Sequence, residues 1–136
     1  MDLHKINCVV VDDDPLMLKI IASGLNALGV AQVQTFEVAE EALAFIGSNR
    51  DLVNVVLCDI FMPDTDGMEF LRALTASGYA GSVGIVSGAG DLMLNITQRL
   101  GNAQGLNVLG AVAKPVTVET LRALLSPPDD GCRAMG

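Results

Sequence analysis

The sequence predicts an α/β fold, a three-layer sandwich in which helices cover both faces of a doubly wound, five-stranded parallel sheet. Five apolar runs of strand length alternate with segments whose apolar residues recur every three or four positions. Such alternation indicates parallel βαβ units. The runs at residues 6–11 and 53–59 are apolar on both faces, which is typical of strands buried between two layers of helices.

The predicted strands and the first helix have clear boundaries. We expect strands at residues 6–11, 32–36, 53–59, 82–86 and 109–113. The first helix begins after the N-cap Asp14, with Pro15 at its first position, and ends at Gly29. Its inward-facing stripe consists of Met17, Ile20, Ile21, Leu25 and Leu28.

Four further helices are expected along the chain. The second ends at Gly47, and the third begins at Asp66 and Gly67. The last spans residues 118–125 and has Thr117 as its N-cap. The four apolar stripes are Ala39, Ala42, Leu43 and Ile46; Met68, Leu71 and Leu74; Leu92, Ile96 and Leu100; and Leu121, Leu124 and Leu125.

One domain accounts for nearly the whole chain. The 136 residues suffice for a single domain with a substantial core and are too few for two. Pro127 and Pro128 stop the last helix, and the residues after them have no periodicity. We therefore expect a domain at residues 1–126 and a flexible tail, or the beginning of a linker, at 127–136.

Composition excludes several classes of function. A net charge of -8 argues against a nucleic-acid-binding surface, which needs clustered basic residues. No stretch approaches the length of a membrane-spanning helix, and the N-terminus does not resemble a signal peptide. Cys8, Cys58 and Cys132 form no spaced pair, as expected for thiols in a reducing compartment. These features predict a soluble, cytoplasmic protein.

Polar residues follow the predicted strands at the point where each strand ends. Asp12 and Asp13 follow the first strand, Asp59 closes the third, and Ser87 and Lys114 follow the fourth and fifth. Because ligands of parallel sheets bind outside the carboxyl ends of the strands, these side chains are expected to share one pocket.

Clustered carboxylates at that pocket predict a cation and phosphoryl chemistry. Like charges repel, so the cluster recruits a cation, and Mg²⁺ prefers carboxylate oxygens together with phosphate oxygens. Asp12 and Asp13 suit the role of ligands, whereas Asp59 is placed to be both a ligand and a nucleophile that forms an aspartyl phosphate. Lys114 and Ser87 would neutralise charge on the transferring oxygens.

At these residues the sequence resembles the receiver (CheY-like) domains of bacterial two-component response regulators, over about residues 5–125. Four motifs follow the family pattern in order and spacing: Val-Val-Asp-Asp-Asp-Pro at 10–15, Cys-Asp-Ile-Phe-Met-Pro-Asp-Thr-Asp-Gly at 58–67, Val-Ser-Gly-Ala at 86–89 and Ala-Lys-Pro at 113–115. The implied fold is flavodoxin-like, with strand order 2-1-3-4-5 and five helices.

The resemblance also implies roles for the acidic residues. Asp59 would accept a phosphoryl group from a sensor histidine kinase or a phosphotransfer protein. Asp13 and Asp59 would bind Mg²⁺ directly, Asp12 would do so through water, and the backbone carbonyl of Phe61 would complete the protein ligands. Such a domain is a phosphoacceptor signalling protein that catalyses only its own phosphorylation and dephosphorylation.

The signalling elements of the family are also implied. Ser87 would follow the phosphate after transfer and Lys114 would pair with it, with a cis peptide bond before Pro115. The domain would signal to a partner or an output domain, and phosphorylation would promote a homodimer. Segment 99–114 resembles receivers that precede cyclic-di-GMP phosphodiesterase domains, which indicates an output domain of that kind in a longer chain.

Three positions depart from the family pattern or refine it. Many receivers carry Tyr or Phe three residues before the lysine, where this chain has Ala111. Signalling would then rely on backbone shifts of the fourth helix and fifth strand. Phe61 and Ala89 offer no polar group to position an attacking water, so we expect slow loss of phosphate.

Two alternatives remain open from the sequence. Asp12 and Asp14 have the spacing of the nucleophile and acid of haloacid-dehalogenase-like phosphatases, although Pro15 makes Asp14 a helix cap. The second alternative is a receiver-like binding module that is not phosphorylated. His4 precedes the first strand and is expected to be a solvated residue without a role as a phosphodonor.

Overall fold

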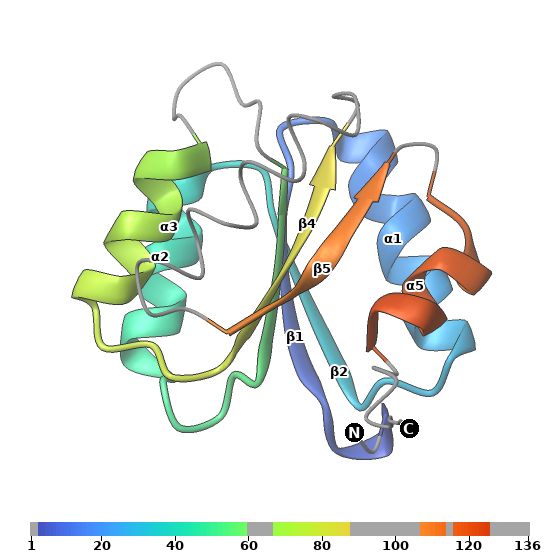
Figure 1. Ribbon diagram of the computed structural model, residues 1–136, viewed down its shortest axis with the longest axis horizontal. Helices are drawn as coiled ribbons and strands as arrows, with labels where there is room; N and C mark the ends of the chain where they lie inside the picture. Colours follow the sequence, from blue (N-terminus) through green and yellow to red (C-terminus); the bar gives the residue numbers. More distant parts are fainter. Residues whose placement is uncertain (1–2, 60–66, 88–106, 114–115, 126–136) are drawn as a thin grey trace.

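Five parallel strands form one sheet in the order β2-β1-β3-β4-β5. The computed structural model describes residues 3–59, 67–87, 107–113 and 116–125 (Figure 1). The strands are β1 (Asn7–Val11), β2 (Gln32–Phe36), β3 (Val55–Asp59), β4 (Ser82–Ser87) and β5 (Asn107–Ala113). The predicted strand order is therefore confirmed.

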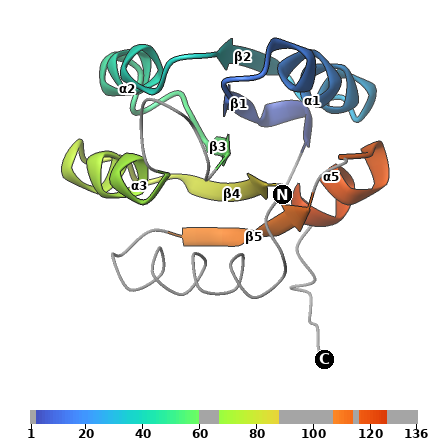
Figure 2. The ribbon, with the colours of Figure 1, turned by 90° about the horizontal axis from the view of Figure 1, so that it is seen from above.

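Helices cover both faces of this sheet. The described helices are α1 (Pro15–Ala27), α2 (Ala39–Ser48), α3 (Gly67–Ala76) and α5 (Val118–Leu125), with a 3₁₀ turn η1 (Leu3–Lys5) at the beginning. Seen from above, α2 and α3 lie on one side of the sheet, and α1 and α5 lie on the other (Figure 2). The three-layer sandwich is confirmed.

Each layer of helices encloses its own hydrophobic core. The α2 and α3 side contains Phe70, Leu71 and Leu74, and the α1 and α5 side contains Ile21 and Leu25, all almost fully buried. Burial of one such side chain contributes about 1.5–3 kcal/mol. All five residues of β3 are buried, as the sequence predicted for a strand covered on both faces.

Three helix ends lie at the residues that the sequence predicts. The Asp14 carboxylate Oδ1 accepts a hydrogen bond from the backbone N–H of Leu16 at 3.0 Å, and Pro15 is the first residue of α1. At α5, the Thr117 hydroxyl accepts from the backbone N–H of Thr120 at 3.1 Å. Gly29 follows α1 with φ 89°, a conformation that favours glycine. These three predictions are confirmed.

Two details of the helices were predicted wrongly. Gly47 does not end α2, which continues to Ser48 and is closed by Asn49, whose side-chain amide donates to the Phe45 carbonyl at 2.8 Å. On α1, Ile20 is 42% exposed, and Leu18 is buried instead. A single glycine lowers the stability of a helix by only about 1 kcal/mol, so the tertiary packing of α2 outweighs the cost of Gly47.

The strand ends shift by one or two residues from the predicted bounds. β1 and β3 begin later than expected, whereas β5 begins at Asn107. The expected stripe of Leu92, Ile96 and Leu100, the beginning of the third helix at Asp66 and the proline stop at 127–128 lie outside the described residues.

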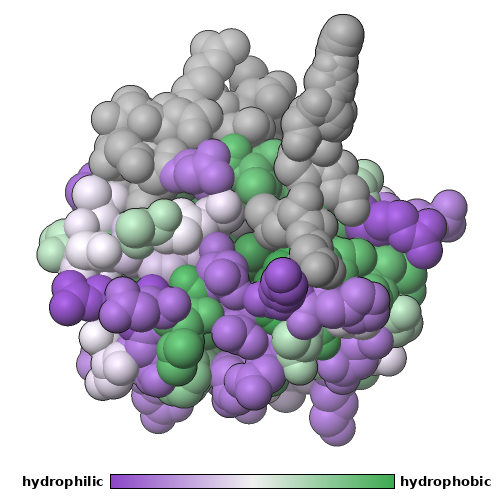
Figure 3. Space-filling view, turned by 90° about the horizontal axis from the view of Figure 1, so that it is seen from below, coloured by the Kyte–Doolittle hydropathy of each residue, from purple (hydrophilic) through white to green (hydrophobic). Residues whose placement is uncertain are grey.

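The described surface is mixed in polarity. Seen from below, hydrophilic residues cover most of it and separate smaller hydrophobic patches (Figure 3). Cys8 and Cys58 are buried in the core, as predicted, and burial raises the pKa of each thiol to about 12. None of the described helices is long and apolar enough to cross a membrane.

Candidate functional site

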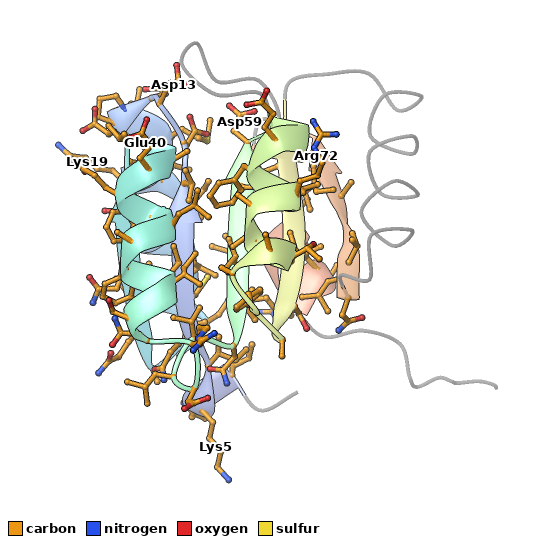
Figure 4. All side chains as sticks on the ribbon, turned by 90° about the vertical axis from the view of Figure 1, so that its left-hand side faces the viewer. Lys5, Asp13, Lys19, Glu40, Asp59 and Arg72 are labelled. Atoms are coloured by element: carbon orange, nitrogen blue, oxygen red, sulfur yellow. The ribbon has the colours of Figure 1, made fainter. Side chains whose placement is uncertain are left out.

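Three carboxylates meet at the carboxyl edge of the sheet. Asp12 and Asp13 directly follow β1, and Asp59 is the last residue of β3. Because β1 and β3 are neighbours with Val11 opposite Cys58, Asp12 continues β1 beside Asp59. One carboxylate oxygen from each of the three aspartates lies within 4.8 Å of the others. Figure 4 shows Asp13 and Asp59 at the same end of the molecule, with Lys5 at the opposite end.

The three side chains differ in their exposure to solvent. Asp12 is 1% exposed and Asp59 is 4% exposed, whereas Asp13 lies at the surface. Placing carboxylates in a buried site is costly unless opposite charge or hydrogen bonds compensate. Among the described residues, the cluster is therefore open to solvent at Asp13, where a cation or a substrate can approach the two buried carboxylates.

The loop after β1 holds Asp12 in position from two directions. The backbone N–H of Asp12 donates to the Phe36 carbonyl, at the end of β2, at 3.1 Å. The Oδ1 atom of its side chain accepts from the backbone N–H of Asp14 at 2.9 Å. Asp14 thus orients Asp12 with its backbone while its own carboxylate caps α1. The sequence predicts Asp14 as a helix cap, or as the acid in the phosphatase alternative, and its orienting bond to Asp12 was missed. The spacing of two residues from Asp12, typical of an Asx turn, was the available signal.

The chemistry of this donor set fits Mg²⁺. Three carboxylates offer the hard oxygen ligands that Mg²⁺ binds, and their mutual repulsion is relieved by a divalent cation. No His or Cys side chain belongs to the cluster among the described residues, so its ligands are all oxygens.

The other predicted site residues are described only in part. Ser87 is the last residue of β4, one position beyond Val86, which pairs with Asp59. Its backbone is therefore at the same edge of the sheet. Phe61, Lys114 and Pro115 lie outside the described residues.

Ala111 occupies the position where the family commonly has an aromatic ring. It lies in β5 opposite Ile85, is half-buried and packs against the core on the α2 and α3 side. No aromatic ring is therefore present at this position to change rotamer.

The strand order and the acidic edge define a flavodoxin-like α/β domain with a candidate metal site at the carboxyl ends of its strands, and comparison with known proteins identifies its family. The family model of the response regulator receiver domain matches residues 8–126. The chain belongs to this family, which serves signalling in two-component systems.

Several characterised proteins are similar to this chain. The cyclic di-GMP phosphodiesterase RocR of Pseudomonas aeruginosa is 28% identical over 124 residues, which cover 91% of this chain and 31% of that protein. The two-component response regulator ORR23 of Oryza sativa is 31% identical over 127 residues, covering 84% of this chain and 16% of that protein. The chain thus spans less than a third of either relative.

A solved structure supports the same assignment. The response regulator receiver domain protein of Clostridium thermocellum has a TM-score of 0.75 and 28% sequence identity, and the match covers 89% of this chain and 91% of that one. The receiver fold of this chain is therefore shared along most of its length.

Proposed function

We propose that the chain accepts a phosphoryl group on Asp59 from a sensor histidine kinase or a phosphotransfer protein. The observation that carries this proposal is the buried carboxylate of Asp59 at the end of β3, within 4.8 Å of carboxylate oxygens of Asp12 and Asp13. Phosphorylation then changes the conformation of the domain, and the change signals to a partner or an output domain.

The transfer is a substitution at phosphorus. A carboxylate oxygen of Asp59 forms the new P–O bond while the P–N bond to the donor imidazole breaks. The electron pair of the P–N bond returns to the imidazole nitrogen, and the product is an acyl phosphate. The chain supplies the nucleophile and the carboxylates that position the cation.

Mg²⁺ would neutralise charge that develops on the transferring oxygens when it is bound. Asp13 and Asp59 are proposed as direct ligands, Asp12 as a ligand through water and Phe61 as a ligand through its carbonyl. Ser87 and Lys114 are proposed to contact the phosphoryl group, with a cis peptide bond before Pro115.

Transmission and partners are proposed on the same basis. With Ala111 in place of a ring, the change of conformation travels through the backbone of the fourth helix and β5. Residues 1–126 act as the receiver and 127–136 as a tail or linker, in the cytoplasm. Similarity to RocR supports a cyclic-di-GMP phosphodiesterase as the output domain of a longer chain, and phosphorylation is proposed to favour a homodimer.

The proposal is tested by labelling with acetyl phosphate and Mg²⁺, followed by intact-mass analysis. We expect one added phosphoryl group per chain, lost slowly because Phe61 and Ala89 offer no polar group to position water. Asp59→Asn should abolish the label. Asp14→Asn is the matched control, because Asn also caps helices and the backbone N–H to Asp12 remains.

Other outcomes would point to the alternatives. A label that persists in Asp59→Asn and disappears in Asp12→Asn would support the phosphatase, against which stands the capping bond of Asp14. A chain that binds Mg²⁺ and takes no label would be the non-phosphorylated binding module.

A further inference from the structure

A small, partly enclosed cavity lies between the amino-terminal half of the sheet and the end of α2, away from the acidic cluster. Its volume is about 180 Å³, and residues of β1, β2, α2 and the segment that follows α2 line it. Four primary amides, Asn7, Gln32, Gln34 and Asn49, lie around it, and its apolar lining includes Val9 and Phe45. All of its lining residues belong to the described part of the chain.

Two of the four amides belong to the edge strand β2, on the side of the sheet that faces α2. Asn7 pairs with Gln32, and Val9 pairs with Gln34, so two polar residues of the edge strand stand beside β1. Phe36 packs against the core on the α2 side, and the alternation of strand residues places Gln32 and Gln34 on that same side. Gln32 and Gln34 are both exposed on this edge strand. The cavity is therefore open to solvent beside β2, and the two glutamine amides are accessible to a ligand.

Hydrogen bonds orient two of the amides and leave their oxygens as acceptors. The Nδ2 atom of Asn7 donates to the Leu52 carbonyl at 3.0 Å, and the Nδ2 atom of Asn49 donates to the Phe45 carbonyl at 2.8 Å. Within the described residues, the side chains of Gln32 and Gln34 make no hydrogen bond with the protein. The cavity thus offers fixed acceptors from asparagine and adaptable donors and acceptors from glutamine.

The size and polarity of the cavity restrict the ligand. Its volume equals that of about six water molecules at ~30 Å³ each, smaller than the ~300–1,000 Å³ of sites for drug-sized ligands. None of the described lining residues carries a charge at neutral pH, so a neutral ligand is favoured. Phe45 provides an apolar surface for a flat ring.

We propose that this cavity binds a neutral purine base, free or as part of a nucleoside. A primary amide can pair with a neighbouring donor and acceptor on a base, as Asn and Gln do with the amino group and ring nitrogen of adenine. Gln34 pairs with Val9 in the sheet, and its side chain can make such a pair with a base that lies against the apolar lining of Val9 and Phe45. The site is distinct from the acidic edge and does not depend on phosphorylation of Asp59.

Adenine and adenosine titrated into the 15N-labelled full chain test the proposal by NMR. We expect saturable shifts of the amide NH₂ signals of the cavity, with a dissociation constant on the order of 1 mM, and intermolecular NOEs from the base to the Phe45 ring. Gln34→Ala should weaken binding by roughly fivefold or more, since a bidentate pair is lost. Thr35→Ala is the matched control, because Thr35 is exposed on the opposite face of the same strand.

Three results would overturn the proposal. One is the absence of saturable shifts with adenine, guanine and their nucleosides, in a chain whose spectrum shows it folded. A second is equal affinity of Gln34→Ala and wild type for adenine. The third is an affinity for toluene equal to that for adenine. It would show that the cavity recognises apolar surface and that its amides do not contribute to recognition.

Discussion

The acidic residues at the end of β1 and β3 are arranged so that their environments differ. Asp12 and Asp59 are buried, whereas Asp13 is exposed and is the member of the cluster most open to solvent. Three carboxylates this close repel one another when ionised. The fold therefore gives up part of its stability for an acidic site whose ligands suit a cation.

Removing the negative charge of Asp13 should restore part of that stability. Without Mg²⁺, Asp13→Asn is expected to raise the free energy of unfolding, because repulsion within the cluster falls. With Mg²⁺ at a hundred times its dissociation constant, wild type should gain about 2.7 kcal/mol, and the variant should gain much less. Urea unfolding with EDTA and with Mg²⁺ measures both quantities.

Asp51→Asn provides the control for this experiment. Asp51 is also exposed, but it follows α2 at the end of the molecule opposite the acidic cluster. Its replacement should therefore leave the stabilisation by Mg²⁺ unchanged. Equal stabilisation of wild type and Asp13→Asn by Mg²⁺ would rule out Asp13 as a ligand.

At the scale of elements, α5 is held close to the sheet by a glycine in β4. A Cβ atom at Gly84 would lie 2.6 Å from Cδ2 of Leu57 and 2.8 Å from Cδ2 of Leu124. Both leucines are buried, so they have little room to move. The approach of α5 to β4 therefore requires glycine at this position.

Two glycine-to-alanine variants should have opposite effects on stability. Gly84→Ala is expected to lower the free energy of unfolding by about 1–3 kcal/mol, because it overpacks the contact between β4 and α5. Gly47→Ala should raise it by roughly 0.5–1 kcal/mol, since Gly47 lies inside α2 and a Cβ atom there meets nothing within 4 Å. Denaturant midpoints of the two variants and wild type decide the matter. A stabilised Gly84→Ala would mean that the leucines rearrange freely.

At the scale of the whole molecule, the buried thiols limit the pH range of the fold. Burial raises the pKa of Cys8 and of Cys58 from 9.0 to about 12, and the neighbouring Asp59 carboxylate adds to the increase at Cys58. The unfolded chain loses these protons near pH 9, whereas the folded chain retains them. Stability from the neutral thiols is thus fully present below pH 9 and is lost as the pH rises toward 12.

The expected loss is up to about 1.4 kcal/mol per pH unit for each thiol within this interval. Urea unfolding at a series of pH values from 7 to 11 measures the slope. Cys8→Ala should have a shallower slope than wild type above pH 9, even if the alanine lowers stability at pH 7. Parallel slopes for the two proteins would show that Cys8 titrates alike in the folded and unfolded chains.

Sequence patterns predicted most of this architecture because its determinants are local. Apolar runs located the strands, and Asp14 and Thr117 located helix ends, since a cap depends on residues within one turn. The meeting of Asp12 with Asp59 followed from the rule that parallel strands end at one edge.

The features that the sequence predicted wrongly or did not predict have a different physical origin. The end of α2 depends on an amide of Asn49 that reaches the Phe45 carbonyl and on packing that tolerates Gly47. The amide-lined cavity depends on the pairing of β1 with β2, which brings Asn7 beside Gln32. Neither relationship is visible in a single stretch of sequence.

The position of β3 has a consequence for how a change at Asp59 reaches both layers of helices. Its residues alternate between the two cores: Val56 and Cys58 belong to one, and Val55 and Leu57 to the other. A displacement of this strand at Asp59 moves atoms in both layers of helices at once. Proteins that dock on opposite sides of the domain would then sense the same change, and each surface could evolve separately without altering the chemistry at the tip of the strand.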